Sequence, residues 1–270
     1  MNPHYRLDQP ALISVSGGRT SGFMLRKILD AFGGELPRDV IPVFCNTGRE
    51  HEATLQFLKE IGERWCPIVW LEYRREDDKH GFAVVDYCTA SRNGEPFAAA
   101  IQARSYLPNP VTRFCTAELK IRTGNRFAKW LGWESFTRAI GLRYDEPLRV
   151  AKMKGEGNEE AVMPLHAARR TLAHVRSFWA EQEFDLQLPG DDNAFGNCDL
   201  CFLKARAKVE KVLRADPSRG EWWAEQEALV GASFRNDRPT YRQMLTQLTV
   251  QGQMFDDAIE DDTLPCNCTD

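Results

Sequence analysis

The chain has 270 residues, of which 43% are hydrophobic and 27% charged, and a formal net charge of −4 at pH 7. This length suits one large α/β domain with an extension, and the acidic balance argues against a dedicated nucleic-acid binder while leaving a local basic patch open. No run approaches the roughly 18 apolar residues of a membrane span, and the first residues, "MNPHYRLDQP", lack the apolar centre of a signal peptide. We therefore expect a cytoplasmic protein without membrane contact.

Apolar, β-branched runs predict buried strands at 11–16, 40–45 and 67–72, and helical patterns follow the first two. Such alternation is typical of a parallel sheet with helices on both faces. A helical stretch at 116–131 and a further strand at 136–141 extend it. The sequence therefore predicts an α/β fold with a twisted parallel sheet in residues 1–165, in which the strand at 11–16 is central.

The region 166–270 has a mostly helical pattern, with predicted helices at 171–182, 201–216 and 221–230. A turn-rich stretch at 188–201 leads into the first cysteine pair of this region, C-x-x-C, which we place at the start of the helix 201–216. A helix start would lower the pKa of these thiols. We interpret 166–270 as a helical, cysteine-bearing C-terminal region.

The turn "SGGRTS" joins the first strand to a helix. Glycines allow positive φ and close backbone approach, and a helix N-terminus offers amide donors and partial positive charge. The turn therefore suits a phosphate, pyrophosphate or sulfate, although a turn without any ligand is the alternative. The candidate residues are Ser16, Gly17, Gly18, Arg19, Thr20 and Ser21. The pattern is neither a Walker loop nor Gly-x-Gly-x-x-Gly.

The second strand ends in polar residues, where ligands of open α/β sheets bind. These candidates are Asn46, Thr47, Gly48 and Glu50. They would lie at the same sheet edge as the glycine turn if the two strands are parallel.

The segment "SGGRTS" resembles the Ser-Gly-Gly-x-x-Ser loop of the PP-loop ATP pyrophosphatase family in the adenine nucleotide α-hydrolase superfamily. This family includes N-type ATP pyrophosphatases, tRNA-thiolating enzymes and adenylyl-sulfate reductases, and many members carry Lys-Asp in place of Arg19-Thr20. Three further segments, "VFCNTGREHEATLQFL", "RFCTAELKIRT" and "GLRYDEPLR", resemble segments of the reductases in the same order. Over residues 1–150 the chain looks like a phosphoadenosine/adenylyl-sulfate reductase-like protein of the phage and bacterial type.

The resemblance implies a Rossmann-like fold of the PP-loop type that binds the phosphate or sulfate end of an adenine nucleotide, either ATP or an adenylyl sulfate. It makes Arg113 a further binding residue and Arg19, Lys120 and Arg143 the candidate catalytic residues. Asp145 and Glu146 either coordinate Mg²⁺ or pair with neighbouring arginines, and we favour pairing.

The cysteines suggest a metal centre, because C-x-x-C places two thiolates on one ion or cluster. Iron–sulfur reductases of the family carry a Cys-Cys pair followed downstream by C-x-x-C, whereas here Phe114 replaces the first cysteine. A four-cysteine site would need a tail cysteine, so the predicted ligands are Cys115, Cys198, Cys201, Cys266 and Cys268. A 4Fe-4S cluster is favoured over structural zinc. A redox dithiol is the third alternative.

Three functions compete. The first is an enzyme that adenylates an acceptor for sulfur transfer, the second an adenylyl-sulfate reductase, and the third a non-catalytic, zinc-containing protein that binds nucleotides or nucleic acid. The tail "PCNCTD" lacks the Glu-Cys-Gly-x-His segment of thioredoxin-dependent reductases, which favours the first. A sulfur donor or thiol reductant protein would be a partner. Basic residues at 204–214 suggest either a nucleic-acid contact or, as we favour, a solvated helix face. The sequence leaves the oligomeric state open.

Overall fold

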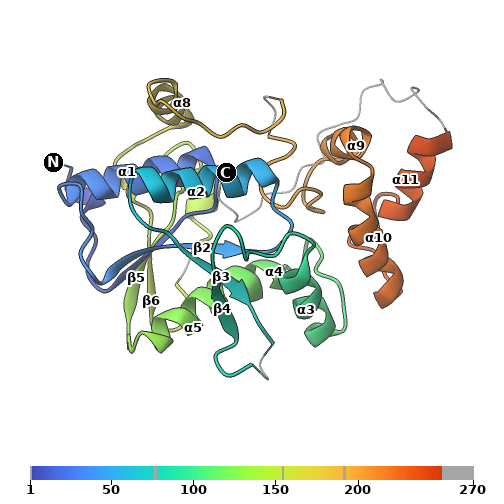
Figure 1. Cartoon of the computed structure of the whole chain (residues 1–270), viewed down its shortest axis with the longest axis horizontal. Coiled ribbons are helices and arrows are strands. Elements are labelled where there is room, and N and C mark those ends of the chain that lie inside the picture. Colours follow the sequence, from blue (N-terminus) through green and yellow to red (C-terminus); the bar gives the residue numbers. More distant parts are fainter. Residues whose placement is uncertain (1, 76–77, 154, 191–192, 251–270) are drawn as a thin grey trace.

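The computed structural model describes residues 2–75, 78–153, 155–190 and 193–250. Its centre is a six-stranded sheet with the order β4-β3-β2-β1-β5-β6 (Figure 1). The strands are β1 (Ala11–Ser14), β2 (Val40–Asn46), β3 (Val69–Tyr73), β4 (Phe82–Val85), β5 (Phe136–Ala139) and β6 (Glu159–Val162). Every neighbouring pair is parallel except β3 and β4. The predicted α/β fold with β1 in the centre is confirmed.

Helices cover both faces of the sheet. One face carries α1 (Arg19–Ala31), α2 (Glu52–Arg64) and α8 (Leu172–Ala180), and the other carries α3 (Glu95–Arg104), α4 (Phe114–Thr116) and α5 (Thr123–Trp130) (Figure 1). The π-helical segment η2 (Ala117–Arg122) joins α4 to α5. The short elements η1 (Pro3–Tyr5), α6 (Pro147–Val150) and α7 (Pro164–Ala167) complete this part of the chain.

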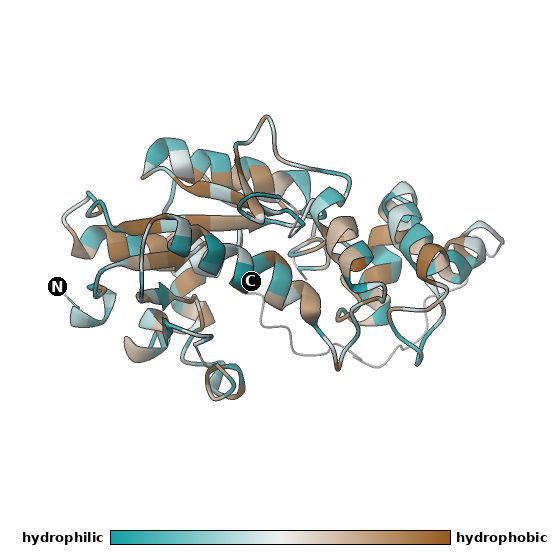
Figure 2. Ribbon diagram, turned by 90° about the horizontal axis from the view of Figure 1, so that it is seen from below, coloured by the Kyte–Doolittle hydropathy of each residue, from teal (hydrophilic) through white to brown (hydrophobic). Residues whose placement is uncertain are grey.

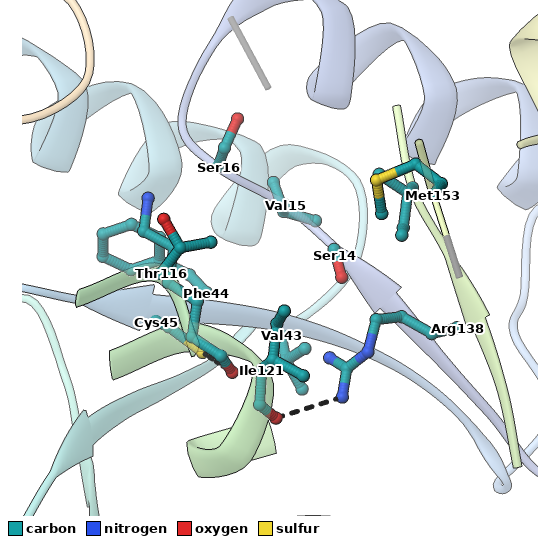
Figure 3. A pocket seen from close by; sticks show the side chains of 12 residues that line it. Ser14, Val15, Ser16, Val43, Phe44, Cys45, Thr116, Ile121, Arg138 and Met153 are labelled. Carbon is teal, nitrogen blue, oxygen red and sulfur yellow. Dashed lines mark hydrogen bonds between the residues drawn. The ribbon is translucent and has the colours of Figure 1, made fainter. Parts of the chain in front are cut away.

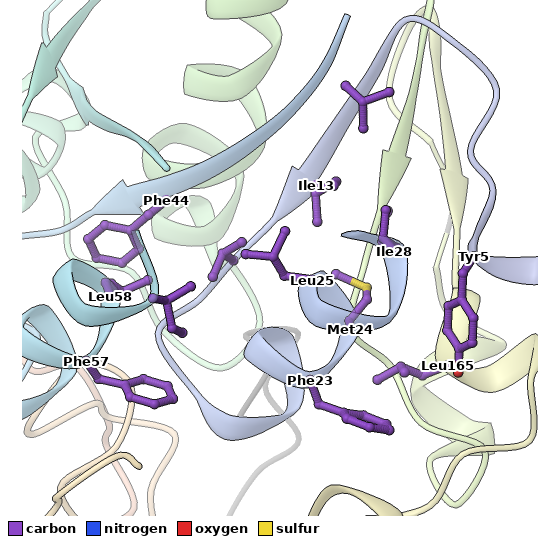
Figure 4. Packing of buried hydrophobic residues seen from close by; sticks show 14 of the residues in the cluster. Tyr5, Ile13, Phe23, Met24, Leu25, Ile28, Phe44, Phe57, Leu58 and Leu165 are labelled. Carbon is purple, nitrogen blue, oxygen red and sulfur yellow. The ribbon is translucent and has the colours of Figure 1, made fainter. Parts of the chain in front are cut away.

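Side-chain alternation along the strands divides the sheet core into two layers. In β1, Ile13 lies in the first core cluster with α1 and α2, whereas Leu12 lies in a cluster with Phe127 of α5. Figure 4 shows Ile13, Met24 and Leu25 packed in the first cluster. Figure 2 shows hydrophobic colour concentrated on the strands, whereas most helices carry both colours. Buried strands and amphipathic helices are the pattern expected of a doubly covered parallel sheet.

The C-terminal helices α9 (Arg206–Ala215), α10 (Ser218–Val230) and α11 (Tyr241–Val250) build a second core cluster. Trp223 and Phe234 lie in it without solvent exposure. Phe97 of α3 and Phe114 of α4 belong to the same cluster, so the helical region shares its core with one side of the sheet.

The division of the chain at residue 165 stays a prediction, but the structure shows where the helices after it pack. Val175 and Trp179 of α8 are buried in the first core cluster, together with Leu186. After α8, the first buried residues that belong to the second core cluster are Ala194 and Phe195. Helix α8 therefore belongs to the sheet by its packing.

The prediction that the C-x-x-C pair opens a helix is wrong, because α9 begins only at Arg206. Leu200, Phe202, Leu203 and Ala205 are all buried. At about 100° per residue a helix would spread these four side chains around its axis, so it could not bury them together. The chain instead passes through turns, and the ammonium of Lys204 donates to the carbonyls of Ala194 (2.6 Å) and Asp199 (2.7 Å).

No described helix is both long and apolar enough to span a membrane.

Candidate functional site

The predicted glycine turn lies between the carboxyl end of β1 and the N-terminus of α1. Ser21 is fully buried and closes the turn. Its hydroxyl accepts from the Ser16 amide (3.1 Å), lies 3.1 Å from the Ser16 hydroxyl and donates to the Gly18 carbonyl (2.9 Å). Ser21 therefore holds the shape of the turn.

The two glycines of the turn have different roles. Gly17 has φ +81°, and a Cβ there would lie 2.4 Å from Cγ2 of Thr54 in α2, so only glycine fits. Gly18 has φ −92° and ψ 159°, which any residue adopts, and it is the N-cap of α1. Because Gly18 has no side chain to accept from the first amides of α1, these donors are left for another acceptor.

Arg143 lies beside this helix N-terminus. Its side chain is mostly buried, and Nη1 donates to the Thr20 hydroxyl (3.0 Å). Nε donates to Asp145 (3.0 Å), and Glu146 lies 3.5 Å from Nη2. Burial alone would raise the pKa of Asp145, but the Leu172 amide and the Arg143 guanidinium outweigh it and keep that pKa low. The favoured pairing of Asp145 and Glu146 with arginines is confirmed.

Arg19, at the start of α1, contacts the segment that follows α8. It makes a two-pronged contact with Asp185 (2.7 and 2.8 Å) and a further hydrogen bond to the Leu186 carbonyl (2.8 Å). These contacts of the Arg19 guanidinium link the segment after α8 to the start of α1. The planar fork suits a carboxylate as well as a phosphate, and the sequence could not reveal which of the two Arg19 would meet.

Asn46 is fully buried at the carboxyl end of β2, and its side-chain nitrogen and oxygen are both hydrogen-bonded within the protein. Its Nδ2 donates to Glu72 of β3 (2.7 Å) and to the Ser91 carbonyl (2.9 Å), and its Oδ1 accepts from the Gly48 amide (3.1 Å). Asn46 thus fixes the shape of the loop after β2. Glu72 and Ser91 were missed by the sequence analysis, although the parallel register Asn46↔Glu72 is the kind of pairing that two adjacent predicted strands imply.

Thr47 and Glu50 form a compact buried group beside the cysteine loop. The Thr47 hydroxyl donates to Glu50 (2.8 Å) and lies 3.4 Å from the Cys198 sulfur. A backbone bridge joins Glu50 to Cys198. Burial raises the pKa of the Glu50 carboxyl, and nearby Lys120 and the Thr47 hydroxyl partly offset that rise. The structure therefore brings the loop after β2 and the C-x-x-C loop together.

A cavity of about 100 Å³ opens at the carboxyl ends of β1 and β2 (Figure 3). Its walls are mainly apolar side chains of β1, β2 and the residue after β5, and η2 closes one side. The lining residues include Val15, Ser16, Val43, Phe44, Cys45, Thr116, Lys120, Ile121, Arg138 and Ile140. Ser16 belongs to both the cavity and the glycine turn, so the two features adjoin.

Arg138 supplies a fixed charge in this cavity. It is 4% exposed and forms an ion pair with Glu159 of β6 (2.7 Å). It also donates to the Ile121 carbonyl (3.4 Å), as Figure 3 shows. Arg113 is half-buried just before α4, outside the set of cavity-lining residues. The sequence analysis missed Arg138, because an arginine inside an apolar strand gives no sign of which groups it will meet.

The predicted metal ligands are divided between described and undescribed residues. Cys115, Cys198 and Cys201 are half-buried and pack against the second core cluster, whereas Cys266 and Cys268 lie outside the described residues. Within the described ranges, no three His, Cys, Asp or Glu side chains stand close enough together to hold a metal ion. The three described cysteines, as they stand, do not fit a cluster or a zinc site.

Comparisons with known proteins give distant similarities. No known family model matches the chain. It is 27% identical to an uncharacterized nin region protein, ORF290, of Escherichia phage lambda, over 92% of this chain and 83% of that protein. It is 24% identical to an uncharacterized 37.8 kDa protein in the gpa 5′ region of Escherichia phage 186, over 85% of this chain and 78% of that protein.

Two solved structures are also similar. The phosphoadenylyl-sulfate reductase of Candida auris in its phosphate complex has a TM-score of 0.41 and 15% identity, and the match covers 69% of this chain and 83% of that chain. The U34-tRNA thiolase NcsA of Methanococcus maripaludis with its 4Fe-4S cluster has a TM-score of 0.41 and 14% identity, covering 86% of this chain and 74% of that chain.

Proposed function

We propose that this protein is a PP-loop-type enzyme that binds an adenine nucleotide at the carboxyl ends of β1 and β2. The observation that carries the proposal is the mostly buried Arg143 guanidinium, which is hydrogen-bonded to the Thr20 hydroxyl at the N-terminus of α1. The N-cap residue of this helix, Gly18, has no side chain. Amide donors, a helix dipole and a fixed guanidinium together favour an anion.

The adjoining cavity suits the nucleotide's base. Its apolar walls can bury a flat ring, and Ser16 joins it to the turn that would hold the phosphates. Lys120 also lines the cavity and is the second candidate cation for the ligand. Arg19 is assigned a structural role instead, since its guanidinium contacts Asp185 and the Leu186 carbonyl. Arg143 also pairs with carboxylates, but one of its nitrogens reaches Thr20 at the helix N-terminus.

The reaction we propose is adenylation followed by sulfur transfer. An acceptor oxygen attacks the α-phosphorus of ATP, and the bond to pyrophosphate breaks. Hydrosulfide from a sulfur donor then attacks the carbon that bears the adenylated oxygen, and AMP leaves with that oxygen. Arg143 and the amides of α1 would hold the departing pyrophosphate, whose charge grows as the bond breaks.

Ligand specificity tests this proposal directly. Calorimetric titration of the full chain with ATP and with adenylyl sulfate, combined with a pyrophosphate-release assay, separates the three candidate functions. Tight ATP binding with pyrophosphate release in the presence of acceptor supports adenylation. Preference for adenylyl sulfate, with sulfite release when a dithiol reductant is added, would point to the reductase, and binding without turnover to a non-catalytic protein.

A second test uses the two residues that face the helix N-terminus. Gly18→Val keeps an allowed backbone conformation but crowds the anion, and Arg143→Gln removes the guanidinium. Each should weaken ATP binding at least tenfold, or about 1.4 kcal/mol. Arg26→Gln, which removes an exposed cation from the far part of α1, is the control and should bind as the unaltered protein does. Unchanged affinity in folded Gly18→Val and Arg143→Gln would contradict the site.

The metal centre is a separate proposal, because the described cysteines do not form a ligand set by themselves. A 4Fe-4S cluster or zinc on Cys115, Cys198 and Cys201 would require a thiol of the tail, Cys266 or Cys268. Anaerobic purification with iron, sulfide and zinc analysis tests this. Removing residues 264–270 should abolish metal content if the tail supplies a ligand. Full metal content in Cys198→Ser and Cys201→Ser variants would leave only the dithiol interpretation.

A further inference from the structure

A second pocket, of about 490 Å³, lies at the outer edge of the sheet. It is formed by the end of the turn between β3 and β4 and by the last turn of α5, in the lower part of Figure 1 and away from α9–α11. Its lining includes Lys79, His80, Phe82, Arg126, Lys129 and Trp130. None of the pocket's residues lines the cavity beside the glycine turn.

Trp130 is the unusual residue of this pocket. Its side chain is 56% exposed, although it stacks on Phe127 (centroids 6.0 Å apart, planes at 18°) and meets Phe82 edge-on. The His80 ring meets it from the turn, at 6.4 Å. Three aromatic neighbours thus hold the indole in place while more than half of it faces solvent. A rigid, exposed indole is a surface on which another flat ring can stack at little entropic cost.

The cations around Trp130 come from two different elements. Lys79 lies on the turn and Lys129 on α5, and both are exposed. Neither forms an ion pair with a carboxylate in the part of the chain that the structure describes. Arg126 also lines the pocket, 3.7 Å from Glu118 and over the Tyr73 ring. Among the described residues of the lining, Asp78 is acidic, and its carboxylate accepts from the His80 amide (3.1 Å).

We propose that this pocket binds a single-stranded nucleic acid, with one base stacked on Trp130 and neighbouring phosphates held by Lys79 and Lys129. An aromatic platform flanked by cations is the arrangement by which proteins hold single strands without reading sequence. The two lysines approach from separate elements, so they can contact successive phosphates on either side of the stacked base. This inference does not rest on the proposed nucleotide site.

The test is fluorescence anisotropy of a labelled 12-nucleotide oligothymidylate, titrated with the full-length protein at several salt concentrations. Trp130→Ala should weaken binding about tenfold or more, in line with the loss of one stacked base. Trp130→Phe keeps a ring and should retain most of the affinity. Lys79→Gln and Lys129→Gln should each lower the slope of log affinity against log salt by about 0.7.

Two controls sharpen the result. Arg38→Gln removes one exposed positive charge just before β2, outside the pocket lining, and should leave affinity and salt slope unchanged. ATP binding should be the same in all pocket variants, because the two sites share no residue. If Trp130→Ala fails to fold, the lysine variants still test the proposal, because both lysines are exposed and their replacement should leave the fold intact.

The proposal would be overturned if Trp130→Ala, Lys79→Gln and Lys129→Gln all bound the oligonucleotide as tightly as the unaltered protein does. Thymidine monophosphate that binds as tightly as the oligonucleotide would also overturn it, because the pocket would then hold a free nucleotide and make no use of a strand.

Discussion

Two thiols outside the C-x-x-C loop pack against the sheet core, Cys66 against the first core cluster and Cys45 against the cluster that contains Leu12. Burial raises the pKa of Cys45 to about 11 and that of Cys66 to about 11, with only partial offset from Arg138 and Arg26 respectively. Cys88 is exposed. Neither Cys45 nor Cys66 should act as a nucleophile near neutral pH, since the thiolate is the reactive form.

The raised pKa values of Cys45 and Cys66 predict that the stability of the fold depends on pH. Between pH 9 and about 11 the unfolded thiols lose protons that the folded ones keep, so the free energy of unfolding should fall as pH rises. The expected slope is about 1.4 kcal/mol per pH unit for each thiol. Urea titrations across this range should show the extra slope in the unaltered protein but not in Cys45→Ala/Cys66→Ala. Identical slopes in both proteins would contradict the assigned burial effect.

At the scale of elements, a glycine sets how closely α8 can approach α1. A Cβ at Gly22 would lie 2.8 Å from the Trp179 ring, and the Trp179 indole donates to the Arg19 carbonyl (2.8 Å). Gly62 of α2 offers a comparison, because a Cβ there meets nothing within 4 Å. Two glycines in helix interiors thus differ only in what surrounds them.

We predict opposite effects of alanine at these two positions. Gly22→Ala should destabilise the protein, because overpacking costs about 1–3 kcal/mol and exceeds the helix-propensity gain of at most about 1 kcal/mol. Gly62→Ala should stabilise it by up to about 1 kcal/mol. Thermal or urea denaturation measures both. Stabilisation by Gly22→Ala would show that α8 does not pack on α1 as described.

At the scale of the whole molecule, Asp199 joins the loop after β2 to the helical region. Its side chain is 2% exposed and accepts from Arg49 (2.7 Å), Arg219 (3.2 Å) and the Trp223 indole (3.1 Å). The Asp199 amide also donates to the Arg49 carbonyl (2.8 Å). Because Asp199 stands inside the C-x-x-C pair, it fixes the cysteine loop relative to the carboxyl end of β2.

Removing this charge should therefore weaken the whole fold. Asp199→Asn leaves the buried Arg49 without its counter-ion, and we expect a loss of about 3–5 kcal/mol in the free energy of unfolding. Asp30→Asn, which breaks the exposed pair with Arg26, should cost less than about 1 kcal/mol. Equal costs for the two variants would mean that Asp199 does not serve as a buried junction.

The amino-acid sequence by itself determined the local elements of this protein. The strands β1, β2, β3 and β5 were predictable because continuous β-branched runs reflect burial on both faces, and the glycine turn because positive φ and a helix start leave a composition signal. The edge strands β4 and β6 were not, because each pairs on one side only and is mostly not fully buried, so neither has the burial on both faces that marks the inner strands.

Only the tertiary structure decided which charged groups meet. Arg19 finds Asp185 and Arg49 finds Asp199, partners that lie far away along the chain, so no local pattern marks them. The start of α9 was likewise set by the burial of Leu200, Phe202 and Leu203 in a core shared with other helices. The chemistry of a side chain limits which groups it can bond, but the packing of distant segments decides which of them it meets. At this candidate site, packing places Arg143 beside Thr20 at the helix N-terminus and Arg19 beside Asp185.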